Sequence, residues 1–218
     1  MSWAALTSGG KDSILACQRA IDSGKDVDYL VTVRPENPDS YMFHSANLDA
    51  VTVIARVSGM KYVEITTHGK KEEELADLEA GLSELNIEGI VAGAVASVYQ
   101  SERVKAIGKR LDLELFTPLW HMDPELLLQE VAQRMDAMIV VTAAGGLDFS
   151  FLGAHFDHTL ITKLKKVAAL HRINLAGEGG EYESLALNAP FFSRPITYTT
   201  TECRSSAERH ELILGGFA

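Results

Sequence analysis

Short apolar runs alternate with amphipathic stretches along most of the chain, an arrangement typical of a parallel β-sheet covered by helices. The runs are rich in β-branched residues, as in Tyr29-Leu30-Val31-Thr32-Val33, which suits strands that are buried on both faces. We therefore predict an α/β fold with a parallel sheet and helices on both of its faces. The predicted strands are Trp3–Thr7, Asp28–Val33, Lys61–Ile65, Gly89–Ala92, Leu113–Phe116 and Ala137–Thr142.

The amphipathic segments between these runs predict the helices. Leucines recur at spacings of three and four between Leu75 and Leu85, which places them on one helix face. Asp123-Pro124-Glu125 combines an N-cap residue, a proline at the first helical position and an early acidic residue, so we expect a helix to begin there. The predicted helices are Ser13–Ser23, Leu48–Ser58, Glu72–Leu85, Ser101–Leu111 and Pro124–Arg134.

After Thr142 the pattern changes, and we predict a second, smaller lobe rather than an independent domain. Ala143–Gly153 is small and loop-like, and Asp157–Arg172 predicts another helix. The expected division is an N-terminal unit of residues 1–145 and a C-terminal lobe of residues 146–218 that is not independent of it.

The end of the chain carries signs of an antiparallel pair. Ile196–Thr201 alternates like an edge strand, and Arg209–Leu214 is predicted to pair with it. An exposed edge strand also suits pairing between subunits, so the sequence is compatible with a homo-oligomer.

The charge balance argues against one class of partner. The chain has 20 Lys and Arg against 30 Asp and Glu, a formal net charge of −10. Such a surface repels phosphate backbones on average, so we expect no nucleic-acid partner. A local basic pocket remains compatible with this charge.

The number of cysteines and the hydropathy of the chain exclude further kinds of site and of protein. Cys17 and Cys203 are the only cysteines, which excludes a disulfide framework, a cysteine-based zinc site and an iron–sulfur cluster. No apolar stretch approaches the roughly 18 residues of a membrane span, and the first residues lack the pattern of a signal peptide. We expect a cytoplasmic protein with no membrane partner, and we expect Cys17 to be a small core residue.

The strongest local signal is Ser8-Gly9-Gly10-Lys11-Asp12-Ser13, which follows a predicted strand and opens a helix. Two glycines let the backbone approach a ligand closely, and the free N–H groups of a new helix attract an anion. The lysine adds a positive charge and the serines add hydroxyl donors. The spacing differs from a Walker A loop and from the dinucleotide fingerprint, so we predict a phosphate cradle of another kind.

This loop resembles the pyrophosphate-binding loop of the N-type ATP pyrophosphatases, HUP-fold enzymes that cleave ATP to AMP and pyrophosphate while adenylating an oxygen of the substrate. Two longer segments resemble the signatures of one family within that group, the diphthine–ammonia ligases. They are Gly93-Ala94-Val95-Ala96-Ser97-Val98-Tyr99-Gln100-Ser101-Glu102-Arg103 and Gly177-Glu178-Gly179-Gly180-Glu181-Tyr182-Glu183-Ser184, with Pro118-Leu119-Trp120 as a shorter third. The resemblance runs along essentially the whole chain, and Ser184 keeps a hydroxyl where the family commonly has threonine.

The resemblance implies a reaction. Diphthine on translation elongation factor 2, ATP and ammonia would give diphthamide, AMP and pyrophosphate through an acyl-adenylate. ATP would be bound with Mg²⁺, whose positive charge would help pyrophosphate leave.

The resemblance also implies the nucleotide site. Lys11, Asp12 and Ser13 are the expected catalytic residues, and Asp12 is also the candidate Mg²⁺ ligand. An equally good interpretation of Asp12 is a carboxylate that pairs with the helix dipole. The alternative for Arg103 is a surface residue on an amphipathic helix, and the resemblance favours its functional role. The expected ATP-binding residues are Ser8, Gly9, Gly10, Lys11, Asp12, Ser13, Ser97, Gln100 and Arg103.

The acidic, glycine-rich segment is the expected acceptor site. Its carboxylates, with the aromatic faces of Tyr182 or Trp120, suit the quaternary ammonium of diphthine. We expect Glu181 and Glu183 to face that cation or a bridging Mg²⁺, and the alternative is a solvated acidic turn. The expected substrate-binding residues are Trp120, Glu178, Gly179, Gly180, Glu181, Tyr182, Glu183 and Ser184.

Other functions of the same loop stay open. A tRNA-modifying enzyme that transfers sulfur needs a persulfide cysteine and a basic surface, and a glutamine-dependent enzyme needs a glutaminase nucleophile, so both fit poorly. A non-catalytic ATP sensor of the same fold remains. Among the histidines, His155 and His158 beside Asp157 are a weak metal signal, and His44 is a candidate pocket residue.

Overall fold

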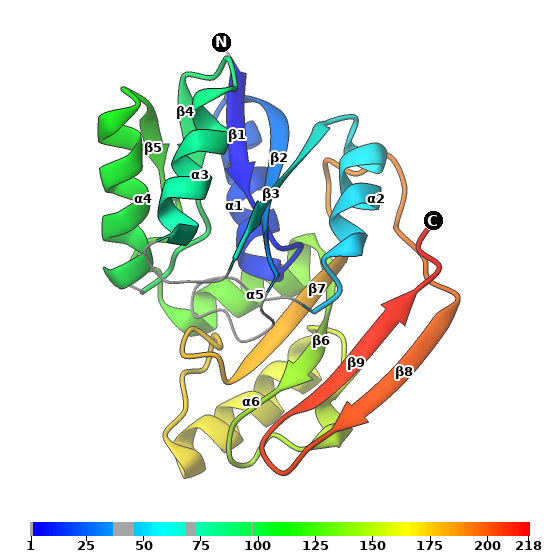
Figure 1. Cartoon of the computed structure of the whole chain (residues 1–218). Helices are drawn as coiled ribbons and strands as arrows, with labels where there is room; N and C mark the ends of the chain where they lie inside the picture. Colours follow the sequence, from blue (N-terminus) through cyan, green and yellow to red (C-terminus); the bar gives the residue numbers. More distant parts are fainter. Residues whose placement is uncertain (1, 37–45, 69–72, 97) are drawn as a thin grey trace.

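A computed structural model describes residues 2–36, 46–68, 73–96 and 98–218 (Figure 1). The first part of the chain alternates strands and helices: β1 Ser2–Leu6, α1 Lys11–Asp22, β2 Asp26–Pro35, α2 Asp49–Ser58, β3 Lys61–Thr67, α3 Glu73–Ser83, β4 Gly89–Val91, α4 Val98–Arg110 and β5 Glu114–Phe116. The second part holds α5 Pro124–Arg134, β6 Asp136–Thr142, the short 3₁₀ turn Phe149–Phe151, α6 His158–His171, β7 Tyr182–Asn188, β8 Thr200–Ser205 and β9 His210–Gly215. In the described part of the chain, no helix has the length and apolar character that crossing a bilayer requires.

The first sheet has the order β3-β2-β1-β4-β5, and every pair in it is parallel. The predicted α/β fold is therefore confirmed. The order reverses at β1, because the chain goes from β1 to β2 on one side and later returns to β4 on the other. In open parallel sheets, ligands bind outside the carboxyl ends of the strands at such a switch point. Here that point is the end of β1 and of β4.

The second sheet is antiparallel, with the order β7-β6-β9-β8. The prediction that Ala137–Thr142 continues the parallel sheet is wrong, since β6 pairs with β7 and β9 instead. The sequence of an apolar strand that is buried on both faces does not show whether its neighbours are parallel or antiparallel. The change of sheet falls between β5 and β6, and the predicted division near residue 145 stays a prediction.

The end of the chain also differs in detail from its prediction. Strand β7 was not predicted, because glycines and glutamates precede its short apolar stretch. The expected edge strand at Ile196–Thr201 is displaced, since β8 begins at Thr200. Its pairing with β9 is confirmed, and β8 is the exposed edge of the sheet.

The core joins the two sheets. On one face of the parallel sheet, Ala4 and Val31 pack with α3 and α4. On the other face, Trp3 and Ala5 belong to a cluster that runs through α1 and α2 into β6 and β7. The C-terminal lobe thus shares a continuous apolar core with the parallel sheet. In Figure 1 the two sheets lie one above the other, with α1 and α5 between them.

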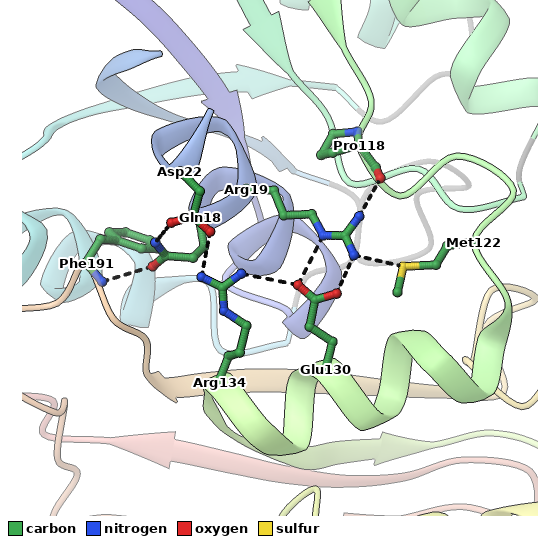
Figure 2. Close-up of polar contacts among 8 residues, drawn as sticks. All are labelled: Gln18, Arg19, Asp22, Pro118, Met122, Glu130, Arg134 and Phe191. Atoms are coloured by element: carbon green, nitrogen blue, oxygen red, sulfur yellow. Dashed lines mark hydrogen bonds and ion pairs between the residues drawn. The ribbon is translucent and has the colours of Figure 1, made fainter. Parts of the chain in front are cut away.

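A polar network at the far end of α1 adds to this connection (Figure 2). Arg19 donates to both oxygens of Glu130 on α5 and, at 3.0 Å, to the carbonyl oxygen of Pro118. Arg134 donates to Asp22 at 2.6 Å. The hydrogen bonds from Arg19 hold the pKa of Glu130 below its usual value. The network fixes α1 against the segments that lead into the second lobe. The loop Ser8–Ser13, called the phosphate loop below, runs into the first turn of α1.

Candidate functional site

The loop between β1 and α1 is held in shape by its own hydroxyl groups. The backbone N–H of Gly9 donates to Thr7 Oγ1 at 2.9 Å, and Thr7 Oγ1 lies 2.7 Å from Ser13 Oγ. Gly9 has φ +82°, a conformation that favours glycine. Gly10 is extended and precedes the first turn of α1, so the backbone N–H groups of that turn face outward from the sheet. The loop thus leads from a strand into a helix N-terminus as predicted, and its binding of an anion stays a prediction.

Strand β7 lies directly against this loop. The backbone N–H of Lys11 donates to Ser184 Oγ at 3.1 Å, and the N–H of Ala186 donates to the carbonyl oxygen of Gly9 at 2.8 Å. A Cβ at Gly10 would lie 3.3 Å from the carbonyl oxygen of Ser184, closer than ordinary contact. The acidic, glycine-rich segment therefore ends on the phosphate loop itself. We expected this segment to form the acceptor site; it adjoins the loop and lines the same cavity, and its role toward the acceptor stays a prediction.

Lys11 connects the same two parts through its side chain. It is 2% exposed, and Nζ donates to Asp12 Oδ2 and to the carbonyl oxygen of Ala176, each at 2.7 Å. Nζ also lies 5.3 Å from the centre of the Tyr182 ring, within reach of a cation–π contact. An ammonium group has three N–H donors, so one remains for a ligand.

Two carboxylates face each other across this region. Asp12 Oδ1 is buried and has no hydrogen-bond partner among the described residues. Glu178 Oε2 accepts from the backbone N–H groups of Val95 and Ala96, at 3.3 and 3.1 Å. Burial and the nearby charge of Asp12 raise the pKa of Glu178, although these hydrogen bonds act in the opposite direction.

One cavity of about 220 Å³ unites these groups at the switch point of the parallel sheet. Its polar wall comes from the phosphate loop and from the C-terminal lobe, and its apolar wall comes from the carboxyl ends of β1, β2 and β4. The lining residues are Leu6, Thr7, Ser8, Gly10, Lys11, Asp12, Ser13, Val31, Val33, Ala92, Gly93, Ala94, Val104, Gly177, Glu178, Tyr182, Glu183 and Ser184.

The carboxylates of the acidic segment have separate roles. Glu181 accepts from the backbone N–H groups of Asn174 and Gly179, at 2.8 and 2.7 Å, so it holds the loop together instead of facing a ligand. Glu183 lines the cavity and accepts from Arg209 Nη2 at 2.8 Å. The expectation that Glu181 and Glu183 face the cationic acceptor or a bridging Mg²⁺ is therefore not met by Glu181, which does not line the cavity.

The aromatic candidates do not line the cavity with exposed faces. Tyr182 is buried, its hydroxyl donates to the carbonyl oxygen of Leu175 at 2.9 Å, and its ring covers Lys11. Trp120 lies half-buried beside His121, with ring centroids 4.6 Å apart. The His121 N–H donates to the carbonyl oxygen of Val95 at 2.8 Å, which places this pair next to the loop after β4.

The remaining predicted residues fall in several places. Gly179 and Gly180 belong to the loop that Glu181 holds and do not line the cavity. Arg103 lies half-buried on α4. Gln100 lies in the first turn of α4, but its side chain, like Ser97 and His44, lies outside the described residues.

The weaker candidates have structural roles. His155 Nδ1 lies 2.5 Å from Asp136 Oδ1, and Asp157 caps α6 by accepting from the Leu160 N–H. No group of three or more metal-binding side chains occurs within the described ranges. Cys17 is in the core, where burial raises the pKa of its thiol to about 12, so the expectation of a core residue is confirmed.

Sequence reasoning missed several parts of the site. Thr7 orders the loop through its hydroxyl, and its position next to Ser8 was an available signal. Gly93 was noted only within a longer segment. No local signal marks Arg209, because its contact with Glu183 depends on how distant strands pair.

The comparisons with known proteins agree with these features. Residues 1–115 match the family model of the diphthamide synthase N-terminal domain, and residues 123–211 match that of the diphthamide synthase C-terminal domain. The chain is 32% identical to the diphthine–ammonia ligases of Rattus norvegicus and Homo sapiens, over 93% of this chain and 84% of each relative. These names carry the predicted enzyme class, a ligase. The resemblance inferred from the sequence motifs is confirmed.

Two other matches differ in extent. The diphthine–ammonia ligase of Schizosaccharomyces pombe is 30% identical, and the match covers 90% of this chain but 36% of that relative. The crystal structure of a predicted tRNA methyltransferase subunit from Methanocaldococcus jannaschii has a TM-score of 0.50 and 16% identity, over 87% of this chain and 98% of that one. At this identity the second likeness supports the fold alone.

Gly93 provides a direct test of the cavity. A Cβ at this position would lie 2.7 to 2.8 Å from backbone atoms of Asp12 and Ser13, so Gly93→Ala must push the loop after β4 away from the phosphate loop. We expect ATP affinity, measured by calorimetry, to fall by about tenfold or more, equivalent to about 1.4 kcal/mol. Gly145→Ala, on an exposed loop with ordinary contacts, is the matched control. Unchanged ATP affinity of a folded Gly93→Ala protein would contradict this view of the cavity.

Proposed function

The chain belongs to the diphthamide synthase family, and from this premise we propose that it is an ATP-dependent ligase that amidates diphthine on translation elongation factor 2. Ammonia is the nitrogen donor, and AMP and pyrophosphate leave through an acyl-adenylate. The observation that carries the proposal is the single cavity, in which the phosphate loop and the C-terminal lobe face the same space. A reaction that joins a nucleotide to an acceptor carboxylate requires both in one place.

The acceptor carboxylate must be activated, because ammonia cannot displace a carboxylate oxygen directly. The carboxylate attacks the α-phosphate of ATP and pyrophosphate leaves; ammonia then attacks the acyl carbon and AMP leaves with the attacking oxygen. In our proposal the loop Ser8–Ser13 binds the departing phosphates, through N–H groups of the first turn of α1 other than that of Lys11 and through the third N–H donor of the Lys11 ammonium.

The donor set of the cavity fits Mg²⁺. Asp12 Oδ1 is a buried oxygen without a partner among the described residues, and Glu178 lies close enough for the two charges to interact. Mg²⁺ prefers oxygen ligands and is commonly bound by one or two carboxylates together with phosphates. In our proposal Asp12 and Glu178 would hold the ion, and its positive charge would neutralise charge on the phosphates. The alternative role of Asp12, a pairing with the helix dipole, leaves Oδ1 unexplained.

The cysteines support free ammonia as the nitrogen source. The Cys17 thiol is buried with a pKa near 12, so it is not available as a nucleophile, and Cys203 lies on the exposed edge strand β8. The same facts disfavour sulfur transfer, which needs a reactive cysteine in the site. A pure ATP sensor would have no need for a second lobe that lines the nucleotide cavity.

Loss of the Lys11 ammonium tests the role of the loop. In Lys11→Ala, a charge-assisted contact with the departing phosphate is lost, worth about 1.5–3 kcal/mol. We expect the loss mainly in turnover, since the contact strengthens as charge develops. Pyrophosphate release and thermal unfolding should be measured together, because Lys11 also holds Ala176. Wild-type pyrophosphate release by the folded variant would remove Lys11 from the mechanism.

The nitrogen source can be tested on the wild-type protein. With ATP, Mg²⁺ and the diphthine-bearing elongation factor, ammonium chloride should support amidation and glutamine alone should not. The rate should rise with pH toward the ammonium pKa, because only unprotonated ammonia attacks the adenylate. Mass spectrometry of the elongation factor reports the product. Amidation driven by glutamine in ammonia-free buffer would refute this part of the proposal.

We expect the ionised Glu178 carboxylate to lower the stability of the fold and to strengthen the binding of Mg²⁺. Its raised pKa means that the fold favours the protonated carboxyl, so this contribution to stability is lost as pH rises through the folded-state pKa. Glu178→Gln can still accept from Val95 and Ala96, and we expect it to be more heat-stable than the wild type above that pKa, with the difference vanishing at lower pH. Mg²⁺ with ATP should stabilise the wild type more than the variant. Equal stabilisation of both would exclude Glu178 as a metal ligand.

A further inference from the structure

We propose that the ion pair between Glu183 and Arg209 receives the zwitterionic end of the acceptor, an inference that rests on the proposed function. The acceptor side chain carries a carboxylate, which is to be adenylated, and a quaternary ammonium. A neighbouring guanidinium and carboxylate on the protein are the complementary charges. In this arrangement Arg209 binds the acceptor carboxylate and Glu183 faces the ammonium.

The strand pairing brings Arg209 next to Glu183, the member of the pair that lines the cavity. Thr142 lies opposite Tyr182 on one side and opposite His210 on the other. The turn between β8 and β9 therefore lies at the same end of the sheet as the start of β7, with β6 between them, although the two segments are far apart in the sequence. Arg209 Nη2 donates to Glu183 Oε1 at 2.8 Å, and Glu183 lines the cavity that contains the phosphate loop.

Arg209 has the capacity to bind a further anion. Its Nε donates to Glu211 Oε1 at 2.7 Å, its Nη2 donates to Glu183, and its side chain remains 39% exposed. Within the described residues Nη1 donates to no protein group, and a guanidinium presents five N–H donors in a planar fork. A carboxylate can be bound by the part of the fork that stays available.

The charge balance of the cavity favours a zwitterion over a simple cation. The wall contains Asp12, Glu178 and Glu183 against Lys11, and the first two carboxylates are assigned to Mg²⁺ in the proposed function. Glu183 is already neutralised by Arg209, so a lone cation would have to compete with a guanidinium. A ligand with both charges satisfies both members of the pair, and its net charge is zero beside the triphosphate.

A purely structural pair is the competing explanation, and the contacts of Arg209 separate the two. Glu211 accepts from the same guanidinium but does not line the cavity. Glu183→Gln and Glu211→Gln thus each remove one charge next to Arg209, on the cavity side and on the other side. If the pair only fastened the β8–β9 turn, the two variants would behave alike.

The experiment uses small probes on the full chain. Trimethylglycine carries both charges, 3,3-dimethylbutanoate has the same shape without the positive charge, and choline lacks the carboxylate. Ligand-observed NMR measures binding of each probe, and amidation of the diphthine-bearing elongation factor measures competition. We expect trimethylglycine to bind and to compete with the elongation factor, and the other two probes to be weaker by about tenfold or more, since each lacks one charged contact.

The variants locate the site. Arg209→Gln and Glu183→Gln should weaken the binding of trimethylglycine and raise KM for the elongation factor by about tenfold or more. KM for ATP should stay within about twofold of the wild-type value, because the groups proposed to bind the nucleotide are different residues. Arg209→Lys should recover part of the loss, and Glu211→Gln should match the wild type in probe binding and KM.

Two outcomes would overturn the inference. One is equal binding of the three probes by the wild type, and the other is unchanged trimethylglycine binding in both Arg209→Gln and Glu183→Gln. If Arg209→Gln does not fold, Glu183→Gln gives the same decision. Amidation by the wild type with no effect of these variants would refute this inference alone. If the substitutions weaken probe binding as expected but the wild type does not amidate the elongation factor, the proposed function would be refuted instead.

Discussion

The contact between β7 and the phosphate loop is the constraint on which the site depends. Ser184 and Ala186 hold the backbone of the loop, and Lys11 reaches back to the carbonyl oxygen of Ala176. Each such hydrogen bond contributes only about 1 kcal/mol net, but together they make the geometry of the loop a property of both lobes. Because the apolar core is also continuous, neither lobe provides the cavity wall alone.

This constraint concentrates charge in a small volume. The loop brings Asp12 and Lys11, and the second lobe brings Glu178 and Glu183. Burial first, and then the nearby charge of Asp12, raise the pKa of the Glu178 carboxyl. In the proposed function, a divalent cation bound with the nucleotide would relieve this repulsion. Glu183, on β7, has the guanidinium of Arg209 beside it, which neutralises its charge.

The local chemistry was accessible from the sequence, whereas long-range pairing was not. The phosphate loop depends on residues that are adjacent in the chain, so its place between a strand and a helix was predicted correctly, and its binding of an anion stays a prediction. The sheet to which β6 belongs depends on its partners, and its apolar run does not distinguish a parallel from an antiparallel neighbour. The sequence pattern of the acidic segment likewise does not show which of its carboxylates face the cavity, because that depends on how the loop folds. Gly177 and Gly180 both have positive φ, and the loop they form turns Glu181 inward while Glu178 faces the cavity.

The central claim is that the acceptor carboxylate attacks ATP within this one cavity. It is tested most directly with the elongation factor labelled with ¹⁸O in the diphthine carboxylate. The account predicts that amidation transfers one labelled oxygen to AMP, because the oxygen that attacks the α-phosphate leaves with it, and that pyrophosphate stays unlabelled. Formation of ADP with the label in inorganic phosphate would contradict the account. Amidation with no label in AMP would contradict it as well.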